Sequence, residues 1–470
     1  MTATTTQLLQ THRETLRGDT LTPLACYRHL RQSGPSFLFE SMEGNGRTSQ
    51  FTVLGRNPLL TFRHRNGTTH IAGSLTGEVV QQGNPFDHLK TLLQSYTFAE
   101  QRIFRNGLLA GYIGFETFRH IEPTLSLDNP DLDDLPDILL VLPGEVLVFD
   151  NYLHTLDLII HGAAEADLEA RRAVLKQELL QVRPSLDIPQ SIPVDQVPRS
   201  EQSDDDYMKG VDRARHYILE GDIFQTVLSR RKTVSGNLPV LDIYRELRRT
   251  NPSPYMYLLE LDDVSIVGAS PETMVKCEND TVLMRPIAGT RRRGHTPEED
   301  HNLALDLLAD QKELAEHDML VDLGRNDVGK VSIIGSVQVP EYRKIEHYSH
   351  VMHIVSTVTG HLRKDCDVVD VFTACFPAGT VSGAPKIRAI EIINDLEQHA
   401  RGPYAGAVGY FDFAGRTDTC IVIRTLVSTK DKAWWQAGAG IVADSISQHE
   451  LEETENKGRV FMQILGQEGA

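Results

Sequence analysis

Short runs of alternating hydrophobic and polar residues, separated by glycine and asparagine, fill the first part of the chain. They are SFLFESMEG, RTSQFTVLGR, PLLTFRHRNG and THIAGSLTG, within residues 36–77, and each predicts a strand. The apolar stretch 138–162 predicts hairpins that turn at Pro143-Gly144 and at Asp150-Asn151. Helical spacing over 83–96 and 164–182 predicts two helices.

The second part of the chain starts with a helical pattern over 204–222 and then alternates less regularly. A long helix is predicted from Pro297 to Leu323 and a final helix over 448–465. Strand patterns cover 255–261, 264–270, 281–289, 336–342, 354–362, 406–413, 419–427 and 434–442. Because these strands cluster as hairpins instead of alternating strictly with helices, the pattern predicts an α+β fold with largely antiparallel sheets.

A proline-rich stretch lies between the two parts. Four prolines occur over 184–198 and three aspartates follow at 204–206, a composition that disfavours regular pairing. The chain of 470 residues also exceeds what one hydrophobic core usually serves. We therefore expect an N-terminal lobe over 1–184, a linker over 185–205 and a second domain over 206–470.

Charge and composition exclude several classes of function. The net charge of -18 disfavours non-specific binding to nucleic acid or anionic membranes, which needs a basic surface. The five cysteines are widely spaced and form no C-x-x-C pair, which argues against a disulfide framework or a zinc site. The N-terminal stretch lacks an apolar signal core, and no apolar run would span a membrane. A cytoplasmic location is expected.

Two Glu-x-x-Glu pairs are the first candidate site. Glu313 and Glu316 lie in one predicted helix, and Glu450 and Glu453 lie in another, so each pair shares one helix face. Like charges at this spacing repel, and Mg²⁺ favours such oxygen ligands. Each pair taken alone is more often a solvated acidic face.

Other candidate elements follow along the chain. The glycine-rich segment 376–389 includes Lys386 and precedes a helical run, which is typical of an anion site or of a structural turn. PIAGTRRRG, 286–294, supplies three arginines. Arg424 ends an apolar strand pattern and would suit a carboxylate, or would be an exposed cation. His353 in an apolar strand is more often a core residue than a catalyst.

The ordered set of motifs is more specific than any single one. PIAGTRRRG, AEHDMLVDLGRND, HVMHIVS, FPAGTVSGAPKIRA, GPYAGAVGYFDF, GAGIVADS and ELEETENK occur in this order, with FLFESMEG and NPSPYMY before them. The set resembles the chorismate-utilising enzymes, and it is most similar to the large components of anthranilate synthases. This resemblance implies two intertwined lobes in which antiparallel sheets form a sandwich flanked by helices.

The resemblance also implies roles for individual residues. It assigns Mg²⁺ to Glu316 and Glu453, with Glu313 and Glu450 in support, and the ion would hold the ring carboxylate of chorismate. The substrate-binding residues would be Gly289, Thr290, Tyr404, Arg424, Gly440 and Lys457. The catalytic residues would be Glu272, as the acid that protonates the departing hydroxyl, His353, which assists the elimination of pyruvate, and Thr380.

Two positions bear on which sibling reaction is catalysed. Aminodeoxychorismate synthases typically carry a nucleophilic lysine where this chain has Ala288, and isochorismate synthases a lysine base at the place of Gln225. Neither side chain here is an amine, which favours ammonia as the nucleophile. Arg292 replaces a proline usual in the family. An aminodeoxychorismate or aminodeoxyisochorismate synthase, and an inactive binding homologue, stay open as alternatives.

The resemblance further implies feedback inhibition and a partner. The tryptophan-binding residues would be Glu40, Ser41, Pro254, Tyr255, Met256, Val408, Tyr410 and Cys420, although a lobe-junction core would use the same residue types. No G-x-C-x-G segment of a glutaminase occurs. A separate glutamine amidotransferase subunit, in a heterotetramer, would therefore supply the ammonia.

Overall fold

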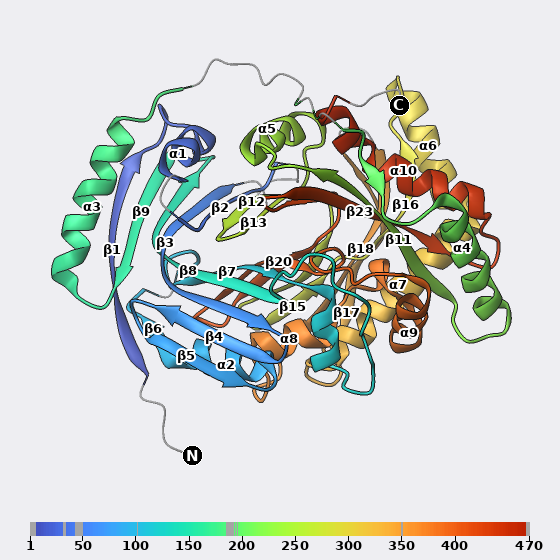
Figure 1. The fold of residues 1–470 in the computed structure, drawn as a ribbon, viewed down its shortest axis with the longest axis horizontal. Helices are drawn as coiled ribbons and strands as arrows, with labels where there is room; N and C mark the ends of the chain where they lie inside the picture. Colours follow the sequence, from blue (N-terminus) through green and yellow to red (C-terminus); the bar gives the residue numbers. More distant parts are fainter. Residues whose placement is uncertain are drawn as a thin grey trace.

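The computed structural model describes residues 6–466 except 32–33, 43–49, 101, 185–191, 193, 195 and 349–350. Much of the first half of the predicted linker, 185–191, 193 and 195, therefore lies outside the described residues, and the division into two domains stays a prediction. The fold is α+β, with a large curled antiparallel sheet flanked by helices (Figure 1). The predicted fold class is confirmed.

The sheet is organised around one long pair of strands. β3 (Phe51–Arg65) and β8 (Ile138–Asp150) pair antiparallel from Phe51 opposite Asp150 to His64 opposite Ile138. Nearly every residue of β8 is buried, as its run of Ile, Leu and Val requires. From this pair the sheet continues in two directions, which we call the first arm and the second arm.

The first arm leaves β3 and the second arm leaves β8. In order of pairing, the first arm contains β2 (Ser36–Glu40), β12 (Tyr255–Leu261), β13 (Val264–Ser270), β22 (Thr425–Ser428), β23 (Lys432–Ile441) and β11 (Gln225–Ser235), which also pairs with β10 (Arg199–Ser200) and β19 (Gly383–Ala384). The second arm contains β7 (Leu108–Ile113), β20 (Ala407–Asp412), β21 (Thr417–Ile421), β14 (Thr273–Glu278), β15 (Thr281–Met284), β18 (Val351–His361), β16 (Ile287–Arg292) and β17 (Gln338–His347). Each arm thus joins strands from before and after the predicted linker.

The remaining strands extend the N-terminal side. β9 (Thr155–Gly162) pairs with β8 and with β1 (Gln7–Arg17), and β4 (Thr68–Gly73) connects β3 to β5 (Gly77–Gln82). β6 (Tyr96–Phe98) runs parallel to β1.

The two arms face each other across a shared hydrophobic core. This inner core contains Phe37, Tyr257 and Ile266 from the first arm and Val408 and Cys420 from the second, all at most 2% exposed. Side chains alternate along each strand, so the opposite faces of both arms also need cover. The arms therefore form the sandwich that the resemblance implied.

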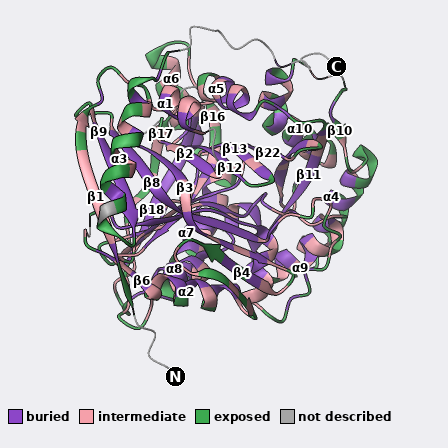
Figure 2. Ribbon diagram, turned by 60° about the vertical axis from the view of Figure 1, so that its left-hand side comes forward, coloured by how far each residue is buried: buried purple, intermediate pink, exposed green. Residues whose placement is uncertain are grey.

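Helices supply that cover (Figure 2). The outer face of the first arm packs against α1 (Pro23–Leu30), α5 (Val240–Thr250) and α10 (Ser447–Ile464), with α4 (Asp204–Leu219) over β11 and β23 and α9 (Lys386–Leu396) over β11 and β19. α3 (Glu165–Leu180) packs on β9 and β1. The second arm packs against α2 (Pro85–Ser95), α6 (Pro297–Ala309), α7 (Gln311–Gly329) and α8 (Val368–Cys375). Two short 3₁₀ turns, η3 (Phe115–His120) and η4 (Gly379–Val381), lie between elements. Among the described residues, no helix is long and apolar enough to cross a membrane.

Several local predictions are wrong. The runs over 47–56 and 58–67 contribute to the single strand β3, and the strands predicted over 281–289 and 419–427 are each interrupted, as β15 and β16 and as β21 and β22. Pro143-Gly144 is not a turn, because β8 continues through it. Pro143 lies opposite Pro58, where the β3 register shifts. A proline is tolerated at such an irregularity because it interrupts no regular ladder hydrogen bond there. The helix predicted from Pro297 to Leu323 is two helices, because Asp310 has an extended backbone and its side chain accepts hydrogen bonds from the first amides of α7. The other predicted helices, α2, α3, α4 and α10, are confirmed within a few residues.

The inner core predicts a large effect of truncation. Ile266→Ala removes apolar contacts between the arms and should lower the free energy of unfolding by about 2–5 kcal/mol. Ile334→Ala, at a side chain that is 99% exposed, is the matched control and should change it by less than about 0.5 kcal/mol. Denaturant titration monitored by circular dichroism measures both, and equal effects would contradict the assignment of the core.

Candidate active site

Two helices from opposite arms bring the four glutamates together. α7 packs on β16 and β18 of the second arm, and α10 packs on β23 of the first. Asp310 caps α7, accepting from the amides of Lys312 and Glu313 at 3.0 and 3.3 Å, so the helix starts just before its carboxylate pair. The predicted helical setting of both pairs is confirmed.

The carboxylates lie close enough to repel. Burial raises the pKa of Glu316, and the negative charges of Glu313 and Glu453 raise it further, against a hydrogen bond from Gln225 and the charge of Lys312. Burial likewise raises the pKa of Glu450, and the Glu453 charge adds to it. The charge of Glu453 on α10 thus acts on Glu316 of α7, from one helix to the other, which is an electrostatic demand for a cation.

Gln225 and Gly440 form the floor beside Glu316. The Gln225 amide donates to Glu316 Oε1 at 3.0 Å. A methyl group on Gly440 would lie 2.8 Å from Gln225 Nε2 and 3.9 Å from Glu316 Oε1. A side chain at this position of β23 would therefore displace the Gln225 amide and occupy space beside Glu316.

Lys457 supplies a positive charge next to Glu453. Its Nζ lies 2.7 Å from Glu453 Oε1, one turn earlier on α10, and donates to the Gly438 carbonyl at 2.8 Å. The Gly438 contact was missed in the sequence, although Gly438 and Gly440 stand two apart on one strand and so share a face.

The second arm contributes an imidazole, a backbone carbonyl and a hydroxyl. His353 Nδ1 lies 3.0 Å from the Gly289 carbonyl and 3.1 Å from Thr290 Oγ1. Gly289 has φ +68° in a bulge between Ala288 and Thr290, a conformation that favours glycine. Burial and the Arg424 charge lower the pKa of His353, although the Gly289 carbonyl raises it. The imidazole is neutral at neutral pH.

Glu272 is a buried acid at the same place. Its burial raises the pKa to about 8, although the nearby Thr380 hydroxyl, the Ile287 amide and the charges of Lys457 and Arg424 all lower it. A carboxyl with this pKa holds its proton at neutral pH. The same causes place Lys457 and Arg424, from different elements, in the field of Glu272.

Arg424 and Tyr404 complete the set. Arg424 stands between β21 and β22 with φ +49°, and its charge acts on both Glu272 and His353; it is half-buried and is not the exposed strand-end cation of the alternative interpretation. Tyr404 is buried on the segment before β20, and its hydroxyl lies 2.7 Å from where a Gly438 side chain would start. Tyr404 thus lies over the face of β23 that Gly438 shares with Gly440.

Two candidate anion-binding elements are used structurally instead. Lys386 Nζ, at the start of α9, pairs with buried Asp327 at 2.7 Å and donates to the Cys375 carbonyl. Arg291, Arg292 and Arg293 pair with the acidic residues Asp306, Asp310, Glu313, Glu299 and Asp300. Arg292, in the place of the usual proline, therefore ties its loop to α6.

The residues of the expected tryptophan site fall into two groups. Glu40 lies opposite Met256 across β2 and β12, and its carboxylate accepts from the Tyr244 hydroxyl of α5 at 2.6 Å. Val408 lies opposite Cys420 across β20 and β21, in the inner core. Tyr255, beside Ser41 and Pro254 at the strand ends, donates to Asp418 at 2.9 Å. Tyr410 stacks edge-on against Phe104.

The carboxylate face has too few ligands to enclose a metal ion by itself. Among the described residues, no three His, Cys, Asp or Glu side chains converge as a protein-built cage. Mg²⁺ needs only one or two carboxylates and keeps water or substrate oxygens in its other positions. Glu316 and Glu453, which face each other closely enough for the Glu453 charge to raise the pKa of Glu316, fit such an open site.

Comparisons agree with this architecture. The family of chorismate binding enzymes matches residues 34–463. Anthranilate synthase component 1 of Acetivibrio thermocellus is 40% identical over 465 residues, covering 96% of this chain and 94% of the relative. The structure of anthranilate synthase component I from Streptococcus pneumoniae TIGR4 is 36% identical, with a TM-score of 0.79 over 94% of this chain and 98% of that one. The menaquinone-specific isochorismate synthase of Escherichia coli shares the fold at 16% identity, with a TM-score of 0.76 over 98% and 95% of the two chains.

Proposed function

The chain belongs to the chorismate binding enzyme family, and we propose that it converts chorismate and ammonia to anthranilate, pyruvate and water, the first step of tryptophan biosynthesis. Its full-length similarity to component 1 of anthranilate synthases supports this reaction. One observation carries the proposal. The site combines two carboxylates that favour a bound cation, Glu316 and Glu453, with a protonated acid, Glu272.

The choice of nucleophile rests on two side chains. Gln225 donates its amide to Glu316 and offers no basic nitrogen, and Ala288 carries no amine. The site therefore has neither a lysine to attack C2 of chorismate nor one to activate water. Ammonia attacks C2 itself, and the C4 hydroxyl leaves as the new bond forms.

Each residue has a defined task. Mg²⁺, when bound by Glu316 and Glu453 with Glu313 and Glu450 behind them, supplies positive charge to the ring carboxylate of chorismate. Gly440 leaves room for that carboxylate and Lys457 adds charge beside it. Arg424 and Tyr404 hold the enolpyruvyl carboxylate, with Gly289, Thr290 and Thr380 next to it. These groups supply locally the positive field that a chain of net charge -18 lacks.

The proposed reaction includes two proton transfers. Glu272 gives its proton to the departing C4 hydroxyl, which leaves as water. In the second step the C2 proton is removed and pyruvate departs. A carbonyl only accepts, so the contact with Gly289 places the His353 proton on Nδ1 and leaves a lone pair on Nε2. His353 can therefore assist this elimination as a neutral base.

The product formed from chorismate, Mg²⁺ and ammonium tests the proposal. Fluorescent anthranilate with an equal amount of pyruvate is expected. A non-aromatic amine without pyruvate would identify a sibling enzyme instead. No consumption of chorismate would identify a binding homologue. Adding a glutamine amidotransferase subunit should let glutamine replace ammonium, since we propose that such a partner supplies the ammonia.

The metal assignment predicts a specific defect. Glu453→Gln should raise the Mg²⁺ concentration for half-maximal activity by on the order of 10–100-fold, because one carboxylate of the proposed site is lost. Glu452→Gln is the matched control, since the neighbouring Glu452 is exposed and points about 100° around α10 from Glu453. Activity that survives a strong chelator, or an equal shift in both variants, would contradict the assignment.

The proposed acid predicts the pH profile. Because burial raises the pKa of Glu272 to about 8, the acid form is present below that pH and is lost above it. At a fixed concentration of free ammonia, kcat/KM for chorismate should fall about tenfold per pH unit on the alkaline side. Glu272→Gln should lower kcat by about 10²–10⁴-fold and remove this alkaline limb. A variant that keeps the limb would exclude Glu272 as the acid.

Feedback inhibition by tryptophan is proposed at Glu40, Ser41, Pro254, Tyr255, Met256, Val408, Tyr410 and Cys420. Tryptophan would favour a form that binds chorismate poorly. Ser41→Ala should raise the tryptophan concentration for half-inhibition by about 5-fold or more without changing kcat, whereas Ser95→Ala, at the exposed end of α2, should not. Unchanged inhibition in Ser41→Ala, measured by anthranilate fluorescence, would count against this site.

A further inference from the structure

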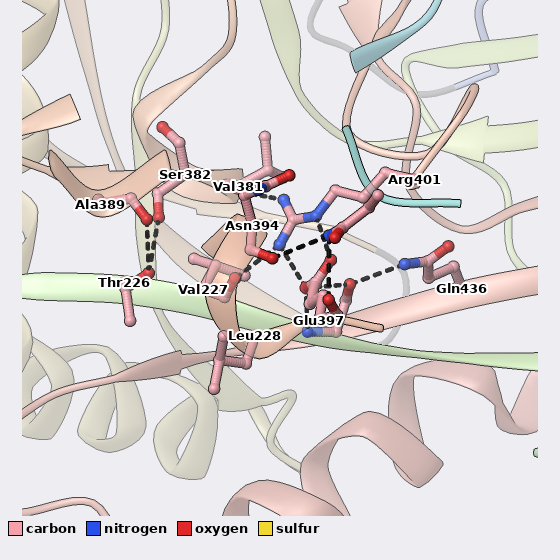
Figure 3. Close-up of polar contacts among 12 residues, drawn as sticks. Thr226, Val227, Leu228, Val381, Ser382, Ala389, Asn394, Glu397, Arg401 and Gln436 are labelled. Carbon is pink, nitrogen blue, oxygen red and sulfur yellow. Dashed lines mark hydrogen bonds and ion pairs between the residues drawn. The ribbon is translucent and has the colours of Figure 1, made fainter. Parts of the chain in front are cut away.

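A buried arginine joins three parts of the candidate site. Arg401 is 1% exposed, and its guanidinium makes four hydrogen bonds. Nε and Nη2 donate to the two oxygens of Glu397 at 2.8 and 2.6 Å, Nη1 donates to the Val381 carbonyl at 2.7 Å, and Nη2 donates to the Val227 carbonyl at 2.7 Å (Figure 3). The guanidinium thus links two carbonyls and one carboxylate that come from different elements.

Both carbonyls belong to segments that carry proposed site residues. Val381 directly follows Thr380 in η4, and Val227 lies two residues after Gln225 in β11. The two segments are also joined through the backbone, where the Val227 amide donates to the Ser382 carbonyl at 3.0 Å and β11 pairs with β19. The guanidinium adds a side-chain link to this pairing, next to the Thr380 hydroxyl.

Glu397 is held from the other side by the first arm. Its Oε1 accepts from the amide and the hydroxyl of Ser229 at 2.8 and 2.7 Å, and the Ser229 hydroxyl accepts from Gln436 at 2.8 Å. Gln436 lies on β23, two residues before Gly438 (Figure 3). The ion pair is therefore fixed to both strands that form the floor.

The same arginine fixes the segment that carries Tyr404. Its guanidinium lies 4.7 Å from the ring centre of Phe115 and 5.6 Å from that of Tyr404. The amides of Arg401 and Gly402 donate to Glu116 at 2.6 and 2.9 Å. Stacking on one side and these two amide bonds on the other leave this segment little freedom.

A buried ion pair is weak evidence of stabilisation, because removing two charges from water costs as much as their attraction returns. The four hydrogen bonds of the Arg401 guanidinium are better explained by a role in orienting the groups that accept them, because a guanidinium can hold several acceptors in one plane and an ammonium cannot. We infer that Arg401, held by Glu397, is a positioning residue that sets Tyr404 and Thr380 relative to Gln225 and Gly440. The inference rests on the proposed function, in which these groups surround chorismate.

Arg401→Lys tests the inference. Lysine keeps the charge but cannot reach all four acceptors, so KM for chorismate should rise about 10-fold or more and kcat/KM should fall on the order of 100-fold, as expected for misplaced substrate-binding groups. KM for ammonium should stay unchanged, since no contact of Arg401 involves the nucleophile. A mere loss of folded protein would lower the apparent kcat and leave KM for chorismate unchanged.

Arg56→Lys is the matched control. Arg56 is also buried, and its guanidinium donates to two carboxylates, Glu145 and Glu178, and to the Leu30 carbonyl, far along the sheet from the site. The Arg56→Lys variant should be less stable than the wild type but should keep the wild-type KM for chorismate. Combining Arg401→Lys with Tyr404→Phe should raise KM by less than the product of the two single effects, because Arg401 acts in part through Tyr404.

The outcomes separate the two proposals. Unchanged KM in Arg401→Lys, or effects that multiply with Tyr404→Phe, would overturn the positioning role while wild-type turnover upholds the proposed function. Absence of wild-type turnover would overturn both. If Arg401→Lys does not fold, Ser229→Ala removes one bond to Glu397 and leaves the ion pair. It should raise KM for chorismate about 2–3-fold, as one lost hydrogen bond allows, and an unchanged KM would overturn the role.

Discussion

The antiparallel pairing of β3 with β8 is the constraint on which the rest of the structure depends. Both arms start from this pair, and their shared inner core holds them face to face. Because the arms are fixed at this end, the strands farthest along them, β11 and β23 in one and β16 and β18 in the other, stand at defined positions. The candidate site is built between these strands and the helices α7 and α10 that cover them. A local slip in β8 would therefore be transmitted to residues far away in sequence.

The surroundings of each carboxyl group in the candidate site determine whether it favours a cation or keeps its proton. Glu316 and Glu453 raise the local demand for a cation, while Glu272 stays protonated because burial outweighs the charges of Arg424 and Lys457. A single site thus keeps some carboxylates available to a metal ion and one carboxyl as an acid. The difference comes from the surroundings, since all are glutamates. Such divergence among like groups is typical of acid and metal roles in one active site.

The sequence indicated the fold class, most helices and both Glu-x-x-Glu pairs, because these depend on local periodicity and capping. Pro143-Gly144 was predicted to be a turn because its composition matches one, but pairing with β3 overrode that preference. The break at Asp310 was missed, although an aspartate before a helical run is an N-cap signal. Lys386 and Arg291 pair with Asp327 and Asp306. These partners are 59 and 15 residues away along the chain, at no spacing that a local pattern would predict. Composition alone could not tell a ligand-binding cation from a structurally paired one.

The role of Arg401 could not be predicted from the local sequence either. Nothing in the local pattern before GPYAGAVGYFDF separates it from an exposed cation, yet its four acceptors lie in three elements. The segment it fixes carries Tyr404 and then continues as β20 with Val408 and Tyr410, which pairs with β7 of the N-terminal part. The proposed substrate contact and the proposed tryptophan contacts are therefore only a few residues apart on one segment. A shift of β20 against β7 would reach Tyr404 directly, so coupling between the two sites needs no long path through the protein.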